Sequence, residues 1–260
     1  MSSTRRPPAG TYAGGLAGLA EDPTVGLVNV AGLHIHEDWL RYSGGGTQDY
    51  GEVGWTRTLV GGSGATVILQ TPTAATELGV LALRTSSNAN RGATLHTSGV
   101  VQVYSPPIGM MWASKLDLSA ITNIEAWSGF TSATSGRVRT SDSTQFIGVR
   151  YLSTVGAWQG VVKNGSGASN ESTVDLGSHT PGTFRILGFE VVETGGAAGL
   201  QFYEYDASDR RKLGRTAYGT PLTTNIPETT GMVAAGVVTL AQAQRIVYQD
   251  FYTIGGRVAR

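Results

Sequence analysis

The sequence predicts an all-β protein built as an antiparallel β-sandwich. Short apolar runs recur along most of the chain at roughly regular spacing, and clusters rich in glycine, asparagine and serine separate them. Almost no stretch shows the 3.6-residue period of an amphipathic helix. The clearest feature is the segment 183–205, which predicts two alternating strands joined by a glycine-rich loop.

In the first arm of this predicted hairpin, Leu187, Phe189 and Val191 share one face, because side chains of a strand alternate between its two faces. The loop 193–199 contains three glycines, which adopt positive φ without steric cost. The second arm, 200–205, alternates again. Two strands with an apolar face need another layer to cover them, so we expect the rest of the chain to supply a second sheet.

The composition limits the classes of protein. The 260 residues include 37 glycines and 40% hydrophobic residues, which suits one large β domain and is too apolar for a disordered chain. The formal net charge is zero, so no basic surface for nucleic acid is expected. Cysteine is absent, which excludes disulfides and thiolate metal sites. No apolar run approaches 18 residues, so we expect no membrane span and no membrane partner.

Residues 1–32 differ from the rest and predict an extended N-terminal arm, followed by a sandwich domain at 33–260. Arg5, Arg6, Pro7 and Pro8 precede a segment rich in glycine and alanine that shows no strand alternation. Two alternatives stay open, since the arm can lie on its own domain or become ordered against a neighbouring subunit. In the second case these four residues are the expected anchors.

From residue 33 onward the chain predicts about fourteen strands. In the first half they are expected at 33–40, 53–56, 65–70, 79–85, 93–96 and 100–103. In the second half they are expected at 110–118, 124–130, 145–152, 158–163, both arms of 183–205, 212–218, 232–240 and 245–254. The segments 145–152 and 158–163 are expected to pair across a short turn.

The order of motifs from residue 110 onward resembles the concanavalin-like, laminin-G-like jelly-roll domains of tailed-bacteriophage virion structural proteins. The resemblance rests on KLDL at 115–118, WSGF at 127–130, FIGVRY at 146–151, Trp158, FRI at 184–186, FY at 202–203, TNIP at 224–227 and DFYTIGGR at 250–257. The segment 37–39 matches the opening strand, which in such folds lies beside the last one.

This resemblance implies an antiparallel jelly-roll and a non-enzymatic structural protein of a phage virion, such as a capsid decoration, head-fibre or tail-associated protein. The implied partners are other virion proteins and further copies of the chain, with a trimer favoured, and the implied location is the virion. No cofactor is expected. The alternative is a carbohydrate-binding module that recognises host-surface glycans, for which Trp39 and Trp55 are candidate sugar-stacking residues. Trp127 and Trp158 are expected in the core.

His34 and His36 share one face of a strand and would form half of a metal site. Glu37, Asp38 and His96 are the candidate residues for further ligands. Zinc needs three or four converging ligands, and nothing in the sequence brings a third to the pair. Calcium needs six to eight oxygens, and the loop 141–143 supplies the single carboxylate Asp142. We therefore expect no metal site.

The segment 204–209, EYDASD, loosely resembles the Glu-x-Asp-x-x-Glu strand motif of concanavalin-like glycoside hydrolases. A retaining glycosidase needs two carboxyl groups about 5 Å apart. The last position here is the shorter Asp209, and 206–210 has the composition of a turn. We therefore expect a solvated hairpin loop, no catalytic residue and no enzymatic activity.

Two glycine-rich segments are expected to be turns. The sequence GGSG at 61–64 resembles a phosphate-binding loop, but it lacks the following Lys-Ser/Thr and a helix that could hold an anion. We predict a hairpin turn there, and another turn at NGSG, residues 164–167.

Overall fold

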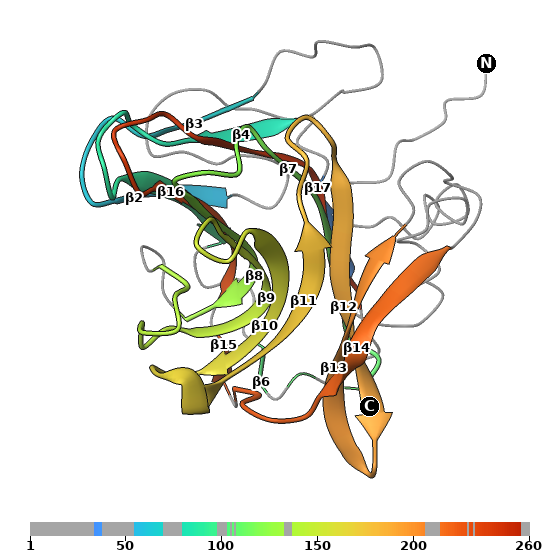
Figure 1. The fold of residues 1–260 in the computed structure, drawn as a ribbon. Coiled ribbons are helices and arrows are strands. Elements are labelled where there is room, and N and C mark those ends of the chain that lie inside the picture. The colour runs from blue at the N-terminus through green and yellow to red at the C-terminus, as the bar shows by residue number, and fades with distance from the viewer. Residues whose placement is uncertain are drawn as a thin grey trace, which may run out of the picture.

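The computed structural model confirms the predicted antiparallel β-sandwich (Figure 1). The structure describes residues 34–37, 55–69, 80–97, 103–104, 106, 108–132, 137–205, 214–227, 229–230 and 232–255. The expected arm at 1–32 lies outside these residues. The described residues contain no helix long and apolar enough to cross a membrane.

Eight strands form the first sheet, in the order β14-β13-β12-β7-β17-β4-β3, with β1 also paired to β17. Their bounds are β1 His34–Glu37, β3 Thr66–Leu69, β4 Leu81–Arg84, β7 Met111–Leu118, β12 Arg185–Thr194, β13 Ala197–Tyr205, β14 Arg215–Leu222 and β17 Ile246–Gly255. Every pairing in this sheet is antiparallel.

Seven strands form the second sheet, in the order β11-β10-β9-β8-β16-β5-β2. Their bounds are β2 Trp55–Val60, β5 Gly92–Thr97, β8 Ile124–Thr131, β9 Gln145–Leu152, β10 Ala157–Asn164, β11 Glu171–Ser178 and β16 Met232–Thr239. A two-stranded sheet joins β6 Val103–Tyr104 to β15 Thr229–Thr230, and a short 3₁₀ turn spans Ala168–Asn170. Figure 1 shows β8 to β11 curving, with their concave side turned away from the first sheet.

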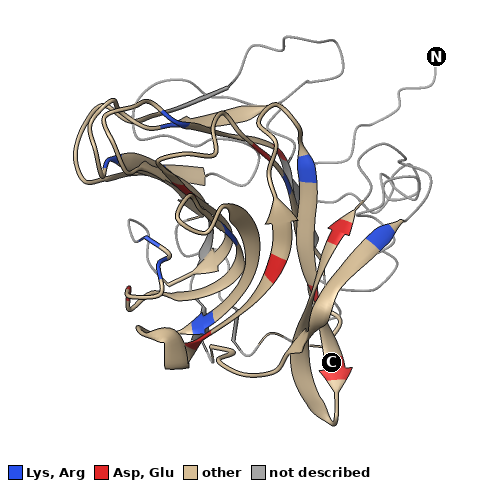
Figure 2. Cartoon of the chain, viewed as in Figure 1, with Lys and Arg blue, Asp and Glu red and all other residues tan. Residues whose placement is uncertain are grey.

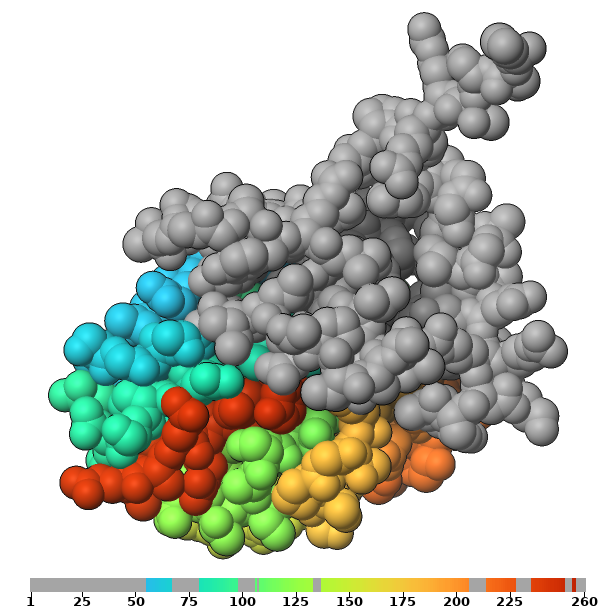
Figure 3. All heavy atoms as spheres, turned by 90° about the horizontal axis from the view of Figure 1, so that it is seen from above, coloured from blue at the N-terminus to red at the C-terminus, as the bar shows by residue number. Residues whose placement is uncertain are grey.

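Neighbouring strands come from distant parts of the chain, as in a jelly roll. β16 lies between β8 and β5, and β17 lies between β7 and β4. Figure 3 shows this mixing on the surface, where the red C-terminal segment lies between the blue-green and green segments. β1 pairs with β17, as the resemblance implies for the opening and last strands.

The hairpin predicted at 183–205 is present as β12 and β13 (Figure 1). Its turn is tighter than the seven-residue loop predicted, because Thr194 pairs with Ala197. Gly195 and Gly196 have φ of 61° and 83°, the left-handed values that a two-residue turn of this kind requires. The hairpin 145–152 with 158–163 is also confirmed, as β9 and β10.

The main core lies between the two sheets. Leu187, Phe189 and Val191 face it with at most 1% of their surface exposed, as their alternation predicts. Trp158 is fully buried there, and Trp127 is buried in a smaller cluster on the outer face of the second sheet. Each such side chain contributes about 1.5–3 kcal/mol by leaving water.

Two predictions need correction. Trp55, a predicted sugar-stacking residue, is fully buried in the main core, so its ring offers no face to a sugar. The turn 61–64 does not close a hairpin, because β2 pairs with β5 in the second sheet and β3 pairs with β4 in the first. Gly61 has φ 72°, and a Cβ there would lie 2.3 Å from the carbonyl oxygen of Asn90.

Candidate functional site

Charged residues are sparse along the described strands (Figure 2). Two groups of them combine a carboxylate with an arginine. The first group lies on the concave outer face of the second sheet, and we call it the concave-face network. It comprises Glu125, Arg137, Arg139, Thr140, Arg150, Gln159, Lys163 and Glu171. The second lies where β12 begins and β13 ends.

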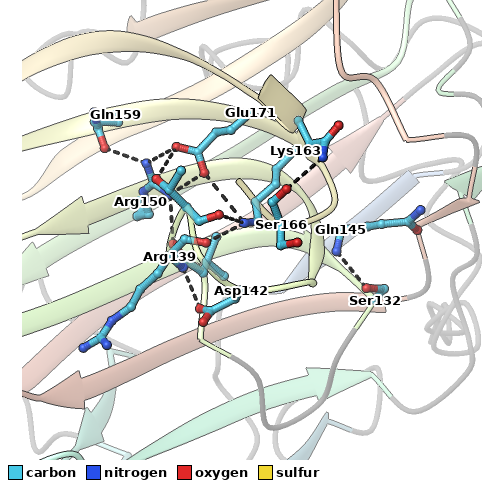
Figure 4. A network of polar contacts seen from close by, with 12 residues as sticks. Ser132, Arg139, Asp142, Gln145, Arg150, Gln159, Lys163, Ser166 and Glu171 are labelled. Atoms are coloured by element: carbon cyan, nitrogen blue, oxygen red, sulfur yellow. Dashed lines mark hydrogen bonds and ion pairs between the residues drawn. The ribbon is translucent and has the colours of Figure 1, made fainter. Parts of the chain in front are cut away.

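Glu171 is the centre of the concave-face network (Figure 4). Arg150 approaches it with two nitrogens, Nη2 to Oε1 at 2.8 Å and Nη1 to Oε2 at 2.9 Å. Thr140 Oγ1 donates to the same Oε1 at 2.9 Å, and Lys163 Nζ lies 3.9 Å from Oε2. The side chains of Arg150, Lys163 and Glu171 are 2%, 0% and 6% exposed, so the cluster is almost dry.

The network also holds the segment 137–142 against the sheet. Lys163 Nζ donates to the carbonyl oxygen of Arg139 and, at 3.0 Å, to that of Thr140. Arg150 Nη1 donates to the carbonyl oxygen of Val138 at 3.0 Å. Arg137 and Arg139 both reach Glu125 on β8.

Between these polar contacts the chain inserts an apolar side chain. Val138 is 2% exposed and packs in the cluster of Val60, Trp127, Phe146, Val161 and Val238. Trp127 lies so close to Gly236 that a Cβ there would meet its ring at 2.2 Å. The segment 137–142 therefore covers the aromatic part of this concave face with the protein's own atoms.

The electrostatics fit a closed ion-pair cluster. Burial opposes ionisation of Glu171, but the hydrogen bonds and charge of Arg150, with help from Thr140 and Lys163, lower its pKa below the ordinary value. Burial is the largest influence on Lys163 and lowers its pKa, against the charges of Glu171 and Asp142. The charges of Arg150 and Lys163 are thus balanced within the cluster by Glu171.

The second group borders a cavity of about 430 Å³, which we call the strand-end pocket. Seven residues from the start of β12, the end of β13 and the start of β14 line it: Phe184, Arg185, Glu204, Tyr205, Gly214, Arg215 and Thr216. An aromatic wall beside a few oriented polar groups is typical of small-molecule and sugar sites.

Glu204 is held at the rim of this pocket by Arg185 and Tyr218. Arg185 Nε donates to Oε1 at 2.7 Å and Nη2 to Oε2 at 2.6 Å, while the Tyr218 hydroxyl donates to Oε2 at 2.7 Å. Burial opposes ionisation, but these bonds and the charge of Arg185 lower the pKa of Glu204. The carboxylate stays 28% exposed.

The outer wall of the pocket is aromatic and basic. The Arg215 guanidinium lies 4.1 Å from the ring centroid of Tyr203, and its Nη1 donates to Glu190 Oε2 at 2.8 Å. Burial raises the pKa of Tyr205 to about 12, although the charge of Arg215 and a side-chain contact between its guanidinium and the Tyr205 hydroxyl act against this. Lys115 lies over the Phe184 ring, 5.0 Å from its centroid.

Sequence reasoning found part of this pocket. It placed Glu204 in the predicted strand 200–205, which is confirmed as part of β13, but it did not predict that the residue is partly buried and paired with Arg185. Asp206 and Asp209 lie outside the described residues. Phe184 and Arg185 belong to the FRI motif of the resemblance but were given no role in a site, and Arg215 was missed, because these residues reach the pocket from other strands.

The remaining predicted sites are not assembled by the described residues. His96 on β5 is 4% exposed and bonds Thr58 at 2.8 Å, in the sheet that does not contain β1. In the parts of the chain that the structure describes, no three His, Asp or Glu side chains are grouped to hold a metal ion. Arg5, Arg6, Pro7, Pro8 and Trp39 lie outside those parts.

Known structures share this fold. A prokaryotic β-1,3-1,4-glucanase (lichenase) from a mouse hindgut metagenome aligns with a TM-score of 0.56 and 12% identity over 86% of this chain and 99% of that chain. The β-glucanase of Bacillus licheniformis aligns at 0.53 and 15% over 86% and 98%. A protein of unknown function from Shewanella oneidensis aligns at 0.56 and 16% over 90% of each chain.

No protein-family model and no curated protein sequence matches the chain. The structural matches establish the concanavalin-like jelly-roll fold. They also contradict the prediction that the chain is not an enzyme, since matching structures of this fold are named as glucanases. The implied phage-virion membership receives no support from them.

Proposed function

We propose that this protein is a carbohydrate-binding β-sandwich whose glycan site is the strand-end pocket. The observation that carries the proposal is the open pocket of about 430 Å³, whose lining includes the ring of Phe184 and the oriented carboxylate of Glu204. Aromatic surface suits the apolar faces of sugars, and fixed polar groups suit their hydroxyls. The names of the matching glucanase structures support the same ligand class.

The contrast with the concave-face network supports this placement. There the segment 137–142 occupies the curved face, and the charged groups bond one another. At the pocket, Glu204 Oε1 accepts one hydrogen bond, from Arg185 Nε, and keeps capacity for a sugar hydroxyl. Thr216, the cross-strand partner of Glu204, adds an exposed hydroxyl group beside it.

Binding is tested by titrating the protein with a panel of neutral and acidic oligosaccharides in a calorimeter. A Phe184→Ala variant is expected to lose at least about tenfold in affinity, because a stacking ring contributes on the order of 1.5 kcal/mol. Val155→Ala is the matched control, since Val155 is 51% exposed in a turn outside the pocket lining. Equal affinity of the Phe184→Ala and wild-type proteins would contradict the pocket as the site, and no binding to any sugar would contradict the function.

Glycoside hydrolysis is the second candidate, favoured because matching structures of this fold are named as glucanases and because Glu204 is a partly exposed carboxylate at the pocket, as a nucleophile requires. The second carboxyl group of such a mechanism would have to come from another residue near 5 Å. Reducing-sugar release from the panel tests this candidate. Loss of release in Glu204→Gln with binding retained would support hydrolysis, and unchanged release would remove Glu204 from it.

Virion attachment, the trimer and the role of the N-terminal arm stay predictions from the sequence. They are tested by light scattering on the purified chain and by comparing it with a chain that lacks residues 1–32. A trimer that is lost on truncation would support the predicted arm contacts. A monomer in both cases would contradict them.

A further inference from the structure

The two arginines of the strand-end pocket differ in how far their hydrogen-bond donors are used. Arg185 donates from Nε and Nη2 to Glu204, from Nη2 to the carbonyl oxygen of Leu176, and from Nη1 to those of Gly177 and Ser178. A guanidinium has five N–H groups, so Arg185 has none left for a ligand. Its task is to fix Glu204 and to tie β12 to β11.

Arg215 is used much less. Its Nη1 donates to Glu190, and the other acceptor beside it among the described residues is the Tyr205 hydroxyl group, to which it forms no well-directed hydrogen bond. Its side chain is 37% exposed, and its position over the Tyr203 ring restricts its orientation. An arginine edge with two parallel N–H groups matches the two oxygens of a carboxylate.

A second polar group lies at this wall. The hydroxyl oxygen of Tyr205 is buried, and although Arg215 lies beside it, it forms no well-directed hydrogen bond to any described residue. Tyr205 and Arg215 are cross-strand partners and both line the pocket. A buried hydroxyl group without a partner costs free energy, which a ligand oxygen reaching this wall would recover.

We propose that the strand-end pocket takes an acidic glycan, one that carries a uronate carboxylate, and that Arg215 is the residue that binds this carboxylate through its Nε and Nη2 edge. The inference rests on the proposed glycan-binding function and adds the class of sugar. Phe184 supports the sugar ring. Glu190 holds Arg215 in the absence of ligand and competes with the carboxylate for it.

The probes are uronate oligosaccharides built from galacturonate, glucuronate, mannuronate or guluronate, each paired with its carboxyl-reduced counterpart. Reduction removes the charge and leaves the sugar backbone unchanged. We expect at least one uronate probe to bind the full chain about tenfold or more tightly than its reduced form, at low ionic strength. A sulfated neutral oligosaccharide is the third arm, and it is expected to bind less well than the uronate.

Two variants are expected to act in opposite directions. Arg215→Gln should weaken uronate binding by about tenfold and leave binding of the reduced probe unchanged. Glu190→Gln should strengthen uronate binding by about threefold, because it removes the competing charge. Arg215→Lys keeps the positive charge but loses the two parallel N–H groups of the guanidinium. Its affinity for the uronate probe should therefore lie between those of wild type and Arg215→Gln. Arg91→Gln, outside the pocket, is the matched control.

Equal binding of uronate and reduced probes would overturn the acidic-glycan inference and leave the glycan-binding function standing. Preference for the sulfated probe would also overturn the carboxylate assignment. Absence of binding to every probe would contradict both proposals. Thermal unfolding of each variant checks that the pocket remains folded, and a loss of uronate binding shared by Arg91→Gln would contradict the role of Arg215.

Discussion

Glu171 and Glu204 are both carboxylates held by two nitrogens of an arginine, yet their surroundings differ. Glu171 is 6% exposed, and it also receives a hydroxyl group from Thr140 and the charge of Lys163. Glu204 is 28% exposed and borders a cavity. The Arg150–Glu171 pair belongs to the network that holds the segment 137–142 on the second sheet. The Arg185–Glu204 pair leaves the Glu204 carboxylate partly exposed at the strand-end pocket.

The difference teaches where binding can occur on this fold. The protein covers part of the concave face with the segment 137–142, including the buried side chain of Val138. Most of the charged groups of this face are held by internal bonds, although Arg137 Nη2 and Arg150 Nε are buried without a partner among the described residues, so a ligand would have to displace the segment 137–142 to reach them. At the strand-end pocket, the aromatic wall and Arg215 keep capacity for an external partner.

The largest effect is expected from Glu171→Gln. The substitution leaves Arg150 and Lys163 buried without their counter-charge, so the free energy of unfolding should fall by about 3–5 kcal/mol. Urea denaturation followed by tryptophan fluorescence measures it. A loss below about 1 kcal/mol would show that water or other groups already solvate this cluster.

Acid should reduce the same contribution. The pKa of Glu171 is lower in the folded chain than in the unfolded chain, so its stabilisation is complete above the unfolded value of about 4.3 and is lost as the pH falls through the folded value. The difference in unfolding free energy between wild type and Glu171→Gln should therefore shrink below about pH 4. A constant difference down to pH 2 would contradict the lowered pKa.

A smaller effect is expected from Glu204→Gln, about 1–2 kcal/mol, because this carboxylate is partly solvated and Arg185 keeps its backbone acceptors. The same urea experiment measures it. If Glu204→Gln lowered the free energy of unfolding as much as Glu171→Gln, the proposed contrast between the partly solvated Arg185–Glu204 pair and the buried Arg150–Glu171 pair would be wrong.

The smallest effect on stability is expected from Arg215→Gln, at most about 1 kcal/mol, since its ion pair with Glu190 is exposed. Thermal unfolding at two salt concentrations measures it, and added salt should reduce the difference from wild type. If the free energy of unfolding fell by several kcal/mol, Arg215 would have a structural role in the sheet instead of a role in ligand binding.

The sequence predicts the fold well because the alternating apolar residues are local signals. Leu187, Phe189 and Val191 show which face of β12 is buried, and Gly195-Gly196 marks the turn. The predicted placement of Trp55 failed, because a tryptophan near a glycine-rich segment carries no sign of whether its ring faces inward. Burial of that kind is set by the pairing of β2 with β5.

The candidate site was harder to predict because its contacts join distant residues. Arg185 and Glu204 are 19 positions apart, and Lys163 reaches Thr140 across 23 positions. A lysine is ordinarily a surface residue, so nothing local indicates that Lys163 is fully buried. The glutamate was found through a loose motif, while Arg215 became visible only once β13 and β14 were paired.

The most direct test of the central claim is an amide NMR titration of the full chain with the oligosaccharide that binds best in the panel. We predict shifts at Phe184, Tyr205 and Thr216 around the strand-end pocket, with those of Glu125, Lys163 and Glu171 unchanged. Shifts confined to the concave-face network would contradict the account, because they would place the ligand where we find the protein's own chain.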